Sequence, residues 1–520
     1  MTKNLNKMKQ YRLIWLIIFI LGFGVRSTHI FQAIDTNSWR EGDVSTIAKN
    51  FYQNGTDIFH PQIAYDGSGP GYVESEFQIY SYLIATSYKI FGVWEPTGRV
   101  ISFLFSLATM LVFFKLTWYL LPNVAAMAAS LFFSLSPFLM IISVAIQPES
   151  VMFFFYMCSA YAFVRWLDSD LRKYYLTAIV FTALALLCKI TAANIGLLFL
   201  LLIIIKKGWK FLFTPKVLIL GVLSVLPSIL WYSYGYRFYA LYGNSLGLSN
   251  ESPWIGWDFF TSPHLIKGLV KIELFDIWNK TGPIIIVLGL IFTKLVKRES
   301  FIFGLCWLSS AYLFYIITSR TTAEHWSWYY HIFSIPAVSI MLGIAVWEIY
   351  RKYFPLLNRR KEIVQKQAFV KSITLIFFLF LSFIYFISSC FNSLLYEKPA
   401  HFQTSRYYTC LDSLKNIIPP NSLILITGGK GIDKLGYAHA ADVSYFYYWL
   451  DIKGYSIHAE DLSYNNILSY RTKGVTYFLA EDGILHTMPG LEEQLKRNSN
   501  PVFECNGCML FKLSESRVEK

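Results

Sequence analysis

The stretch Leu13-Ile-Trp-Leu-Ile-Ile-Phe-Ile-Leu-Gly-Phe-Gly-Val25 decides the fold class of this chain. It belongs to an apolar run over residues 13–30, close to the roughly 20 residues that a helix needs to cross a bilayer. Four basic residues precede it, at Lys3, Lys7, Lys9 and Arg12. A signal peptide also begins this way, but this run is long and lacks a convincing small-residue cleavage site. We therefore interpret it as a first membrane span with a cytoplasmic N-terminus.

The composition of the whole chain supports this interpretation. Of its 520 residues, 55% are hydrophobic and only 15% are charged, against about 25% charged residues in a soluble domain. This excludes a soluble enzyme, a disordered protein and a fibrous protein. The net charge of +13 does not indicate nucleic-acid binding, because the basic residues lie in short clusters between apolar runs, as in cytoplasmic loops.

Ten further apolar runs predict an all-α polytopic membrane domain of about 11 transmembrane helices over residues 1–391. The basic clusters in 165–173, 206–210, 294–298 and 351–361 all fall in expected cytoplasmic loops, as the positive-inside rule requires. We therefore expect an integral, multi-pass protein of the cell (inner or plasma) membrane. The ten expected spans are 98–118, 123–145, 150–167, 174–188, 190–206, 216–239, 282–296, 300–318, 329–350 and 371–391.

The first outer loop, residues 32–97, is polar and acidic. Within it, Phe77–Val93 is apolar, but it is short and rich in tyrosine. We interpret this segment as an interfacial helix that lies on the membrane. If it crossed the membrane instead, several of the basic loops would face outward, against the positive-inside rule.

The last segment, residues 392–520, has the composition of a soluble domain. Ser422–Thr427, Val475–Leu479 and Met509–Leu513 predict strands, and Leu411–Ile418 and Leu491–Lys496 predict helices. We therefore expect a small C-terminal α/β domain. Because the number of expected spans is odd, this domain is placed on the extracytoplasmic side.

The cysteines of this domain suggest a disulfide. Cys505-Asn-Gly-Cys508 is a lone C-x-x-C pair, without the second pair of a zinc site. Its Asn-Gly sequence favours a hairpin turn. An extracytoplasmic location permits a disulfide, either between Cys505 and Cys508 or from this turn to Cys410.

Charged residues near the membrane are costly to desolvate, so they indicate function. The first candidate stretch is Trp39-Arg-Glu-Gly-Asp43. The residues that follow it, 44–53, suit a short helix with Asp43 at its N-cap. Glu74 and Glu76 precede the expected interfacial helix, and Glu149 lies in an outer turn. Each of these carboxylates also has a structural interpretation, as a helix cap or as favourable charge at a helix start.

Two further sites are basic or aromatic. Lys189 interrupts an apolar stretch, where a lysine at a span end extends its ammonium toward water. The turn before the span 329–350 carries Arg320, Tyr329, Tyr330 and His331. Its structural interpretation is an aromatic belt at the membrane interface.

The first outer loop resembles that of the GT-C membrane glycosyltransferases. The similar branch is family 39, which contains the protein O-mannosyltransferases and the lipid A aminoarabinose transferases. The resemblance rests on Trp39-Arg-Glu-Gly-Asp-Val-Ser-Thr-Ile-Ala-Lys-Asn-Phe51 and on Gly69-Pro-Gly-Tyr-Val-Glu-Ser-Glu-Phe77. It is best over the first 200 or so residues and extends more loosely to Tyr329-Tyr330-His331.

The resemblance implies a sugar donor carried on a polyprenyl phosphate and a protein, lipid or glycan acceptor outside the cytoplasm. It implies that Asp43 is the catalytic base, and it matches Glu76 to the later carboxylate of the loop, with Glu74 as its competitor. The family usually has an adjacent Asp-Glu pair, whereas this chain has Glu41-Gly-Asp43, so the second acid is displaced. Glu149 matches the acid of the second outer turn.

These residue types suit the expected chemistry. An acceptor hydroxyl needs a base to remove its proton, and carboxylates stabilise an oxocarbenium-like transition state. The lipid phosphate leaving group needs cations, for which the candidates are Lys189, Arg320 and His331. The family analogy implies inversion at the anomeric carbon. This branch requires no cofactor, although the loop carboxylates leave a divalent metal ion possible.

Two other functional classes compete with a glycosyltransferase. A transporter of lipid-linked sugars or polymers usually has charges in mid-membrane and internal repeats, and neither is clear in this sequence. A non-catalytic assembly protein of the cell envelope would tolerate substitution of Asp43. The sequence does not specify the sugar, the acceptor or the carrier length.

Overall fold

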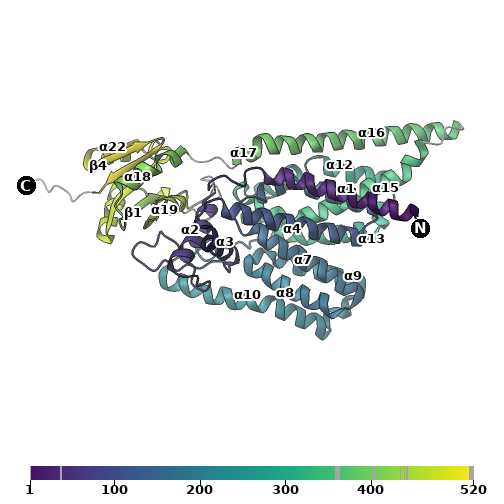
Figure 1. The fold of residues 1–520 in the computed structure, drawn as a ribbon, viewed down its shortest axis with the longest axis horizontal. Coiled ribbons are helices and arrows are strands. Elements are labelled where there is room, and N and C mark those ends of the chain that lie inside the picture. The colour runs from purple at the N-terminus through teal and green to yellow at the C-terminus, as the bar shows by residue number, and fades with distance from the viewer. Residues whose placement is uncertain are drawn as a thin grey trace, which may run out of the picture.

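A computed structural model describes residues 2–34, 38–357, 363–401, 406–433, 435–438, 440 and 443–513. A bundle of long helices forms one end of the molecule, and the tail domain lies at the other end, next to α2 and α3 (Figure 1). The N-terminus lies at the end of the bundle far from the tail domain. Which side of a membrane each end faces stays a prediction.

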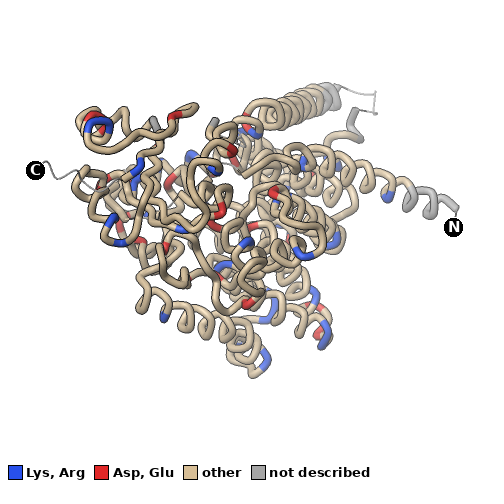
Figure 2. Tube along the Cα trace, turned by 60° about the vertical axis from the view of Figure 1, so that its left-hand side comes forward, with Lys and Arg blue, Asp and Glu red and all other residues tan. Residues whose placement is uncertain are grey.

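Helices form most of the described membrane domain, and loops such as residues 55–78 and 243–257 join them. Lys and Arg, and Asp and Glu, are sparse along the long helices and gather at helix ends and in loops (Figure 2), as expected for helices in a bilayer. The main helices are α1 (Thr2–Ser27), α4 (Thr97–Leu120), α5 (Asn123–Ser134), α6 (Pro137–Ile142), α7 (Glu149–Ser169), α8 (Arg172–Cys188), α9 (Ile195–Lys207), α10 (Pro215–Tyr242), α11 (Pro263–Ile272), α12 (Thr281–Phe292), α13 (Glu299–Ile317), α14 (Ser319–Thr322), α15 (Ile335–Leu357), α16 (Ile363–Asn392) and α17 (Lys398–His401).

In the described residues, eight helices are long and apolar enough to cross a membrane. A ninth span results if the segments 263–277 and 281–292, which meet at a bend of 85°, count as one. The two remaining expected spans are shorter. The run 123–145 breaks between α5 and α6, where Pro137 begins a new helix, and α8 has only 17 residues. The number of eleven spans therefore stays a prediction.

The first outer loop contains two helices, α2 (Trp39–Asn54) and α3 (Ile79–Phe91). The 13 residues of α3 are too few to cross a bilayer, which agrees with the interfacial interpretation of Phe77–Val93. In contrast, the prediction that Asp43 caps a helix over 44–53 is wrong. Helix α2 begins at Trp39, so Asp43 lies within the helix and its carboxylate has no capping role.

The tail domain has a five-stranded mixed sheet with the strand order β2-β1-β3-β5-β4. Strand β1 is parallel to both of its neighbours, β2 and β3. Strand β5 is antiparallel to both of its neighbours, β3 and β4. This confirms the α/β prediction. The elements are α18 (Leu411–Ile417), β1 (Leu423–Thr427), α19 (Tyr445–Leu450), β2 (Lys453–Ile457), α20 (Tyr464–Ser469), β3 (Val475–Glu481), α21 (Asp482–Leu485), α22 (Pro489–Asn498), β4 (Asn500–Cys505) and β5 (Cys508–Lys512).

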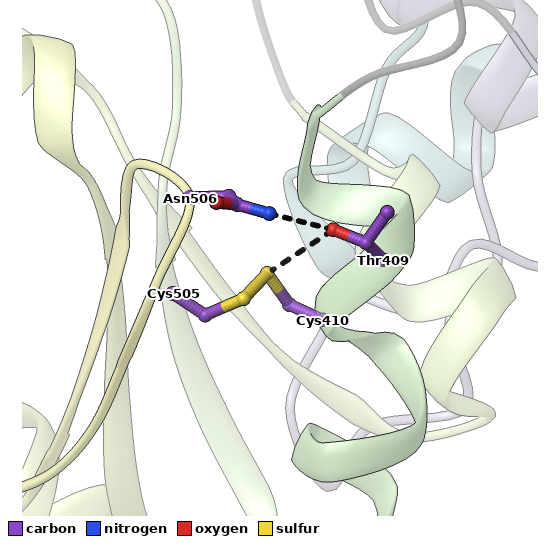
Figure 3. Close-up of a disulfide and its surroundings, with 4 residues drawn as sticks. All are labelled: Thr409, Cys410, Cys505 and Asn506. Atoms are coloured by element: carbon purple, nitrogen blue, oxygen red, sulfur yellow. Dashed lines mark hydrogen bonds between the residues drawn. A yellow bond between two sulfur atoms is a disulfide. The ribbon is translucent and has the colours of Figure 1, made fainter.

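A disulfide joins Cys410 to Cys505, at the hairpin between β4 and β5 (Figure 3). The hairpin turn is Asn506-Gly507, and both residues have positive φ, as the Asn-Gly sequence predicts. Asn506 also donates a hydrogen bond of 2.8 Å from its side chain to Thr409 Oγ1. Of the two pairings considered from the sequence, the structure has the one to Cys410, and Cys508 is buried and not part of a disulfide.

The tail domain packs directly on α2. A Cβ atom added at Gly42 would lie 2.6 Å from Ser444 Oγ and 2.7 Å from the backbone nitrogen of Tyr445. Only glycine allows so close an approach. The glycine that separates Glu41 from Asp43 in the sequence is therefore where helix α19 docks.

Candidate active site

Four of the residues selected from the sequence line one cleft: Glu76, Lys189, Tyr329 and Tyr330. Its lining comes from the outer loop, the end of α8, the loop after α10 and the turn before α15. Its cavity volume is small, about 30 Å³. The charged and aromatic lining residues are Arg40, Glu76, Lys189, Tyr232, Glu251, Trp254, Trp326, Tyr329 and Tyr330.

Arg40 and Glu76 form an ion pair in the wall of this cleft. Arg40 Nη2 lies 2.5 Å from Glu76 Oε1, and both side chains are about nine-tenths buried. Burial lowers the pKa of Arg40, but the electrostatic effect of Glu76, together with those of Tyr329, Tyr330 and Asp43, outweighs it and raises the pKa above its ordinary value. Glu76 therefore fixes the Arg40 guanidinium in the cleft wall and is not an isolated carboxylate.

Lys189 and Glu149 form a second buried ion pair, between the residue that follows α8 and the first residue of α7. The Lys189 ammonium also lies 4.7 Å and 4.8 Å from the ring centres of Tyr329 and Tyr330. Such contacts stabilise a desolvated cation. Within the described residues, the second oxygen of Glu149 has no hydrogen-bond partner. The cleft thus presents two fixed cations, Arg40 and Lys189.

Asp43 lies one turn along α2 from Arg40, and its charge acts on the Arg40 guanidinium. It is completely buried. Tyr65 donates its hydroxyl to Asp43 Oδ1 at 3.3 Å. Asp43 is not among the described residues that line the cleft, and it follows Gly42, where the tail domain docks.

Glu41 is one of the residues expected to bind substrate, but in the structure it forms an ion pair with Arg99 of α4. Arg99 Nη1 and Nη2 donate to its two oxygens at 2.9 Å and 2.7 Å. The backbone N–H of Ile146 donates to Glu41 Oε1 at 2.9 Å. Glu41 and Arg99 are both fully buried, so Glu41 ties the outer loop to the helix bundle and does not line the cleft.

Glu74, the competitor of Glu76 for the carboxylate position of the family, also has a structural role. It accepts hydrogen bonds from Ser245 Oγ at 2.6 Å and from Ser249 Oγ at 3.0 Å. The backbone N–H of Ser249 adds a third bond, at 3.2 Å. Glu74 therefore holds the loop after α10 in place, next to the segment 246–254 that closes one side of the cleft.

Arg320 and His331 do not line the cleft. Arg320 pairs with Asp258, and its guanidinium lies 5.2 Å from the ring centre of Tyr437 in the tail domain. His331 is completely buried. Its Nε2 donates to the Thr322 carbonyl at 2.9 Å, and its Nδ1 lies 2.6 Å from Glu273 Oε1. Neither residue is placed to contact a leaving group in this cleft.

Five charged or aromatic cleft residues are not selected from the sequence: Arg40, Tyr232, Glu251, Trp254 and Trp326. Arg40 lies inside the motif Trp39–Asp43, but its pairing with Glu76 depends on tertiary structure. Trp254 Nε1 donates to Glu251 Oε2 at 3.0 Å. Burial raises the pKa of Glu251 above its ordinary value. Glu251 and Trp254 carry no motif, so no sequence signal identifies them.

No group of three or more His, Cys, Asp or Glu side chains is arranged to hold a metal ion in the part of the chain that the structure describes. The cleft carboxylates are each held by other partners: Glu76 by Arg40, and Glu251 by Trp254. Whether transfer uses a divalent ion stays a prediction.

Comparisons with known proteins agree with this fold. The family model of the dolichyl-phosphate-mannose-protein mannosyltransferases matches residues 78–232. ArnT from Cupriavidus metallidurans bound to undecaprenyl phosphate has a TM-score of 0.58 and 12% identity, over 97% of this chain and 98% of that chain. The oligosaccharyltransferase of Archaeoglobus fulgidus tethered with an acceptor peptide has a TM-score of 0.56 and 12% identity, over 97% of this chain and 74% of that chain.

No curated protein matches this sequence. At 12% identity, the likeness to the two solved structures shows the fold alone. Both of those proteins are glycosyltransferases of the GT-C class. The chain is thus similar to the family 39-like membrane glycosyltransferases of the GT-C class, in sequence over residues 78–232 and in fold over most of its length.

Proposed function

We propose that this protein transfers a sugar from a polyprenyl-phosphate carrier to an extracytoplasmic acceptor, with inversion at the anomeric carbon. One observation carries the proposal: the fold brings Arg40, Glu76, Lys189 and the pair Tyr329-Tyr330 into one cleft. The undecaprenyl phosphate bound to ArnT, a protein of the same fold, supports a lipid phosphate as the donor carrier.

The two cations of the cleft serve the donor phosphate. The bond between the anomeric carbon and the phosphate oxygen breaks during transfer, and the lipid phosphate leaves with that electron pair. Arg40 and Lys189 supply charged hydrogen-bond donors to this leaving group. Their carboxylate partners, Glu76 and Glu149, hold them in position, so that little reorganisation is needed during reaction.

Asp43 serves the acceptor. Its carboxylate takes the proton from the acceptor hydroxyl as the hydroxyl oxygen bonds to the anomeric carbon. A base and a leaving phosphate on opposite sides of the sugar ring give inversion by direct displacement. The buried position of Asp43 beside Arg40 suits this role, because charges act more strongly away from bulk water.

The test uses the full-length protein in detergent with a panel of polyprenyl-phosphate sugars. We expect the wild type to release free polyprenyl phosphate with at least one donor. Asp43→Asn should lose about 10²- to 10⁴-fold in rate, the usual contribution of a general base. Asp57→Asn, which changes an exposed carboxylate of the same loop, is the matched control and should retain activity. Equal release by the wild type and Asp43→Asn would remove Asp43 as the base, and no release with any donor would contradict the glycosyltransferase proposal.

A further inference from the structure

A second polar groove lies on the other side of α2, where the outer loop meets the tail domain. Its cavity volume is about 280 Å³. One wall consists of α2 and residues 64–68 of the outer loop, and the other of residues 421–423 and 447–453 of the tail domain. The function proposed above does not use this groove.

The α2 wall is one face of the helix. Thr46, Lys49, Asn50 and Gln53 are spaced at three, four and seven residues from the first, so they share one side of the helix. With Asn54 they extend over eight residues, about 12 Å along the helix axis. The wall is therefore long, straight and polar throughout.

Contacts across one end of the groove hold its two walls together. Lys49 Nζ lies 2.9 Å from Asp451 Oδ1 and donates to the Tyr448 carbonyl at 2.9 Å. Gln53 Nε2 lies 3.1 Å from both oxygens of Asp451. The groove is thus formed by the docked domain itself and needs no ligand to hold its shape.

The opposite wall has polar side chains that take no part in these contacts across the groove. In the described part of the chain, the side chains of Asn421, Ser422 and Lys453 make no hydrogen bond to the protein. An amide group both donates and accepts hydrogen bonds, and so does a hydroxyl. The charge of Lys49 is balanced by Asp451, so Lys453 is the one charge among the described lining residues that has no ion pair. Its ammonium can donate to hydroxyl oxygens, so this chemistry fits a ligand that is rich in hydroxyl groups and carries no positive charge.

An extended peptide fits less well. Strand β2 is the edge strand next to the groove, and a peptide would bind there by adding a strand. That edge is already covered by the outer loop, because Gly67 N donates to the Gly454 carbonyl at 2.6 Å and Gly454 N donates to the Ala64 carbonyl at 2.9 Å. The backbone groups that would bind a peptide are therefore occupied.

The groove is also close to the proposed base. Thr46 lies one helical turn beyond Asp43. Tyr65, which donates to Asp43, packs on Tyr447 of the groove wall, with 6.0 Å between the ring centres. The groove therefore lies within about one helical turn of Asp43 along α2.

We propose that this groove binds a neutral oligosaccharide, as the part of a glycan acceptor that lies beyond the reacting sugar. The identification of the ligand as an acceptor rests on the proposed function, whereas saccharide binding by the groove does not. Binding and transfer are therefore measured separately.

The experiment is saturation-transfer NMR on the full-length protein in detergent, with neutral gluco-, manno- and galacto-oligosaccharides of two to four sugars at millimolar concentration. Ser422→Trp fills the groove from its partly exposed edge. Thr487→Trp places the same side chain at an exposed site elsewhere in the tail domain and is the matched control. We expect at least one oligosaccharide to bind the wild type and Thr487→Trp, and Ser422→Trp to lose at least tenfold in affinity.

Asp43→Asn separates the two proposals. It should retain oligosaccharide binding even if it abolishes transfer, because Asp43 does not line the groove. If no oligosaccharide binds, or if Ser422→Trp binds as well as Thr487→Trp, the groove is not a saccharide site. Binding of uncharged peptides in place of oligosaccharides would likewise overturn the proposal. Saccharide binding without any release of polyprenyl phosphate would contradict the proposed function alone.

Discussion

Arg99 of α4 donates two hydrogen bonds to Glu41 of α2, at 2.9 Å and 2.7 Å, with both side chains fully buried. This pair joins the first outer loop to the helix bundle. The same loop carries Asp43, which we propose as the base. The acid that departs from the usual family pattern is therefore an anchor for the loop and not a second catalytic group.

The anchoring role predicts a loss of stability. Glu41→Ala leaves the Arg99 guanidinium buried without its counter-charge and should destabilise the protein by about 3–5 kcal/mol. Replacing both residues with apolar ones, as in Glu41→Leu with Arg99→Met, should recover part of this loss. Thermal unfolding in detergent measures both effects. A stable Glu41→Ala protein that has lost only its transfer activity would instead indicate a role in catalysis.

The Arg40–Glu76 ion pair predicts non-additive kinetics. If Glu76 acts by positioning Arg40, then Arg40→Ala, Glu76→Ala and the double variant should lose similar amounts of kcat/KM. Arg40→Lys should recover little, because an ammonium does not reproduce the planar guanidinium. The check is a double-mutant cycle with a fixed donor. Additive losses would mean that Glu76 acts on substrate independently of Arg40.

Lys189 should control affinity for the lipid phosphate. Lys189→Ala removes a charged donor and should weaken binding of free polyprenyl phosphate by about tenfold to a hundredfold. The matched control is Arg320→Ala, because Arg320 is paired with Asp258 outside the cleft. Isothermal titration of the detergent-solubilised proteins separates the two variants. An equal loss in both would mean that the lipid phosphate does not bind beside Lys189.

Glu251 gives a pH-dependent prediction. Burial raises its pKa above the ordinary value of 4.5, so the folded protein holds this proton to higher pH than the unfolded chain does. Stability should therefore fall as pH rises above about 4.5 through the raised pKa, and the loss then persists at higher pH. Glu251→Gln should remove this contribution. Unfolding temperatures of both proteins over a pH series provide the measurement, and parallel curves would show that Glu251 does not titrate in this way.

The disulfide between Cys410 and Cys505 should stabilise the tail domain. The bond closes a loop with a sequence separation of 95 residues, for which chain entropy predicts about 4.7 kcal/mol. Cys410→Ser with Cys505→Ser should therefore lower the unfolding temperature of the tail domain, as monitored by limited proteolysis. Cys508→Ser is the control, since that cysteine is not part of the disulfide. If both variants resist protease equally, the disulfide contributes little to the stability of this domain.

Part of this fold follows from local sequence. Three of the five strands, β1, β3 and β5, were predicted near their observed bounds because each is a compact apolar run. Strands β2 and β4 were missed, because Lys453–Ile457 and Asn500–Cys505 mix polar residues, glycine or proline with few apolar ones. Their pairing with β1 and β5 supplies the strand structure.

The candidate site shows the same division. Asp43, Glu76, Glu149, Lys189 and the Tyr329-Tyr330 pair were selected because charged or aromatic groups at a membrane surface are costly and therefore informative. Position in the sequence could not separate Glu76 from Glu74, or Lys189 from Arg320. Glu76 and Glu74 have the same side chain, and Lys189 and Arg320 carry the same charge. Only their partners in the folded chain distinguish them.

The sequence by itself determined that this is a multi-pass membrane protein with an acidic outer loop and a separate α/β tail, because apolar run length and charge placement act locally. Tertiary structure alone decided which charges face the cleft. Arg99 neutralises Glu41, Asp258 neutralises Arg320, and Glu273 binds His331, whereas Arg40 and Lys189 remain at the cleft wall. The physical reason is that a buried charge requires a partner, and in this protein that partner comes from a segment distant in sequence.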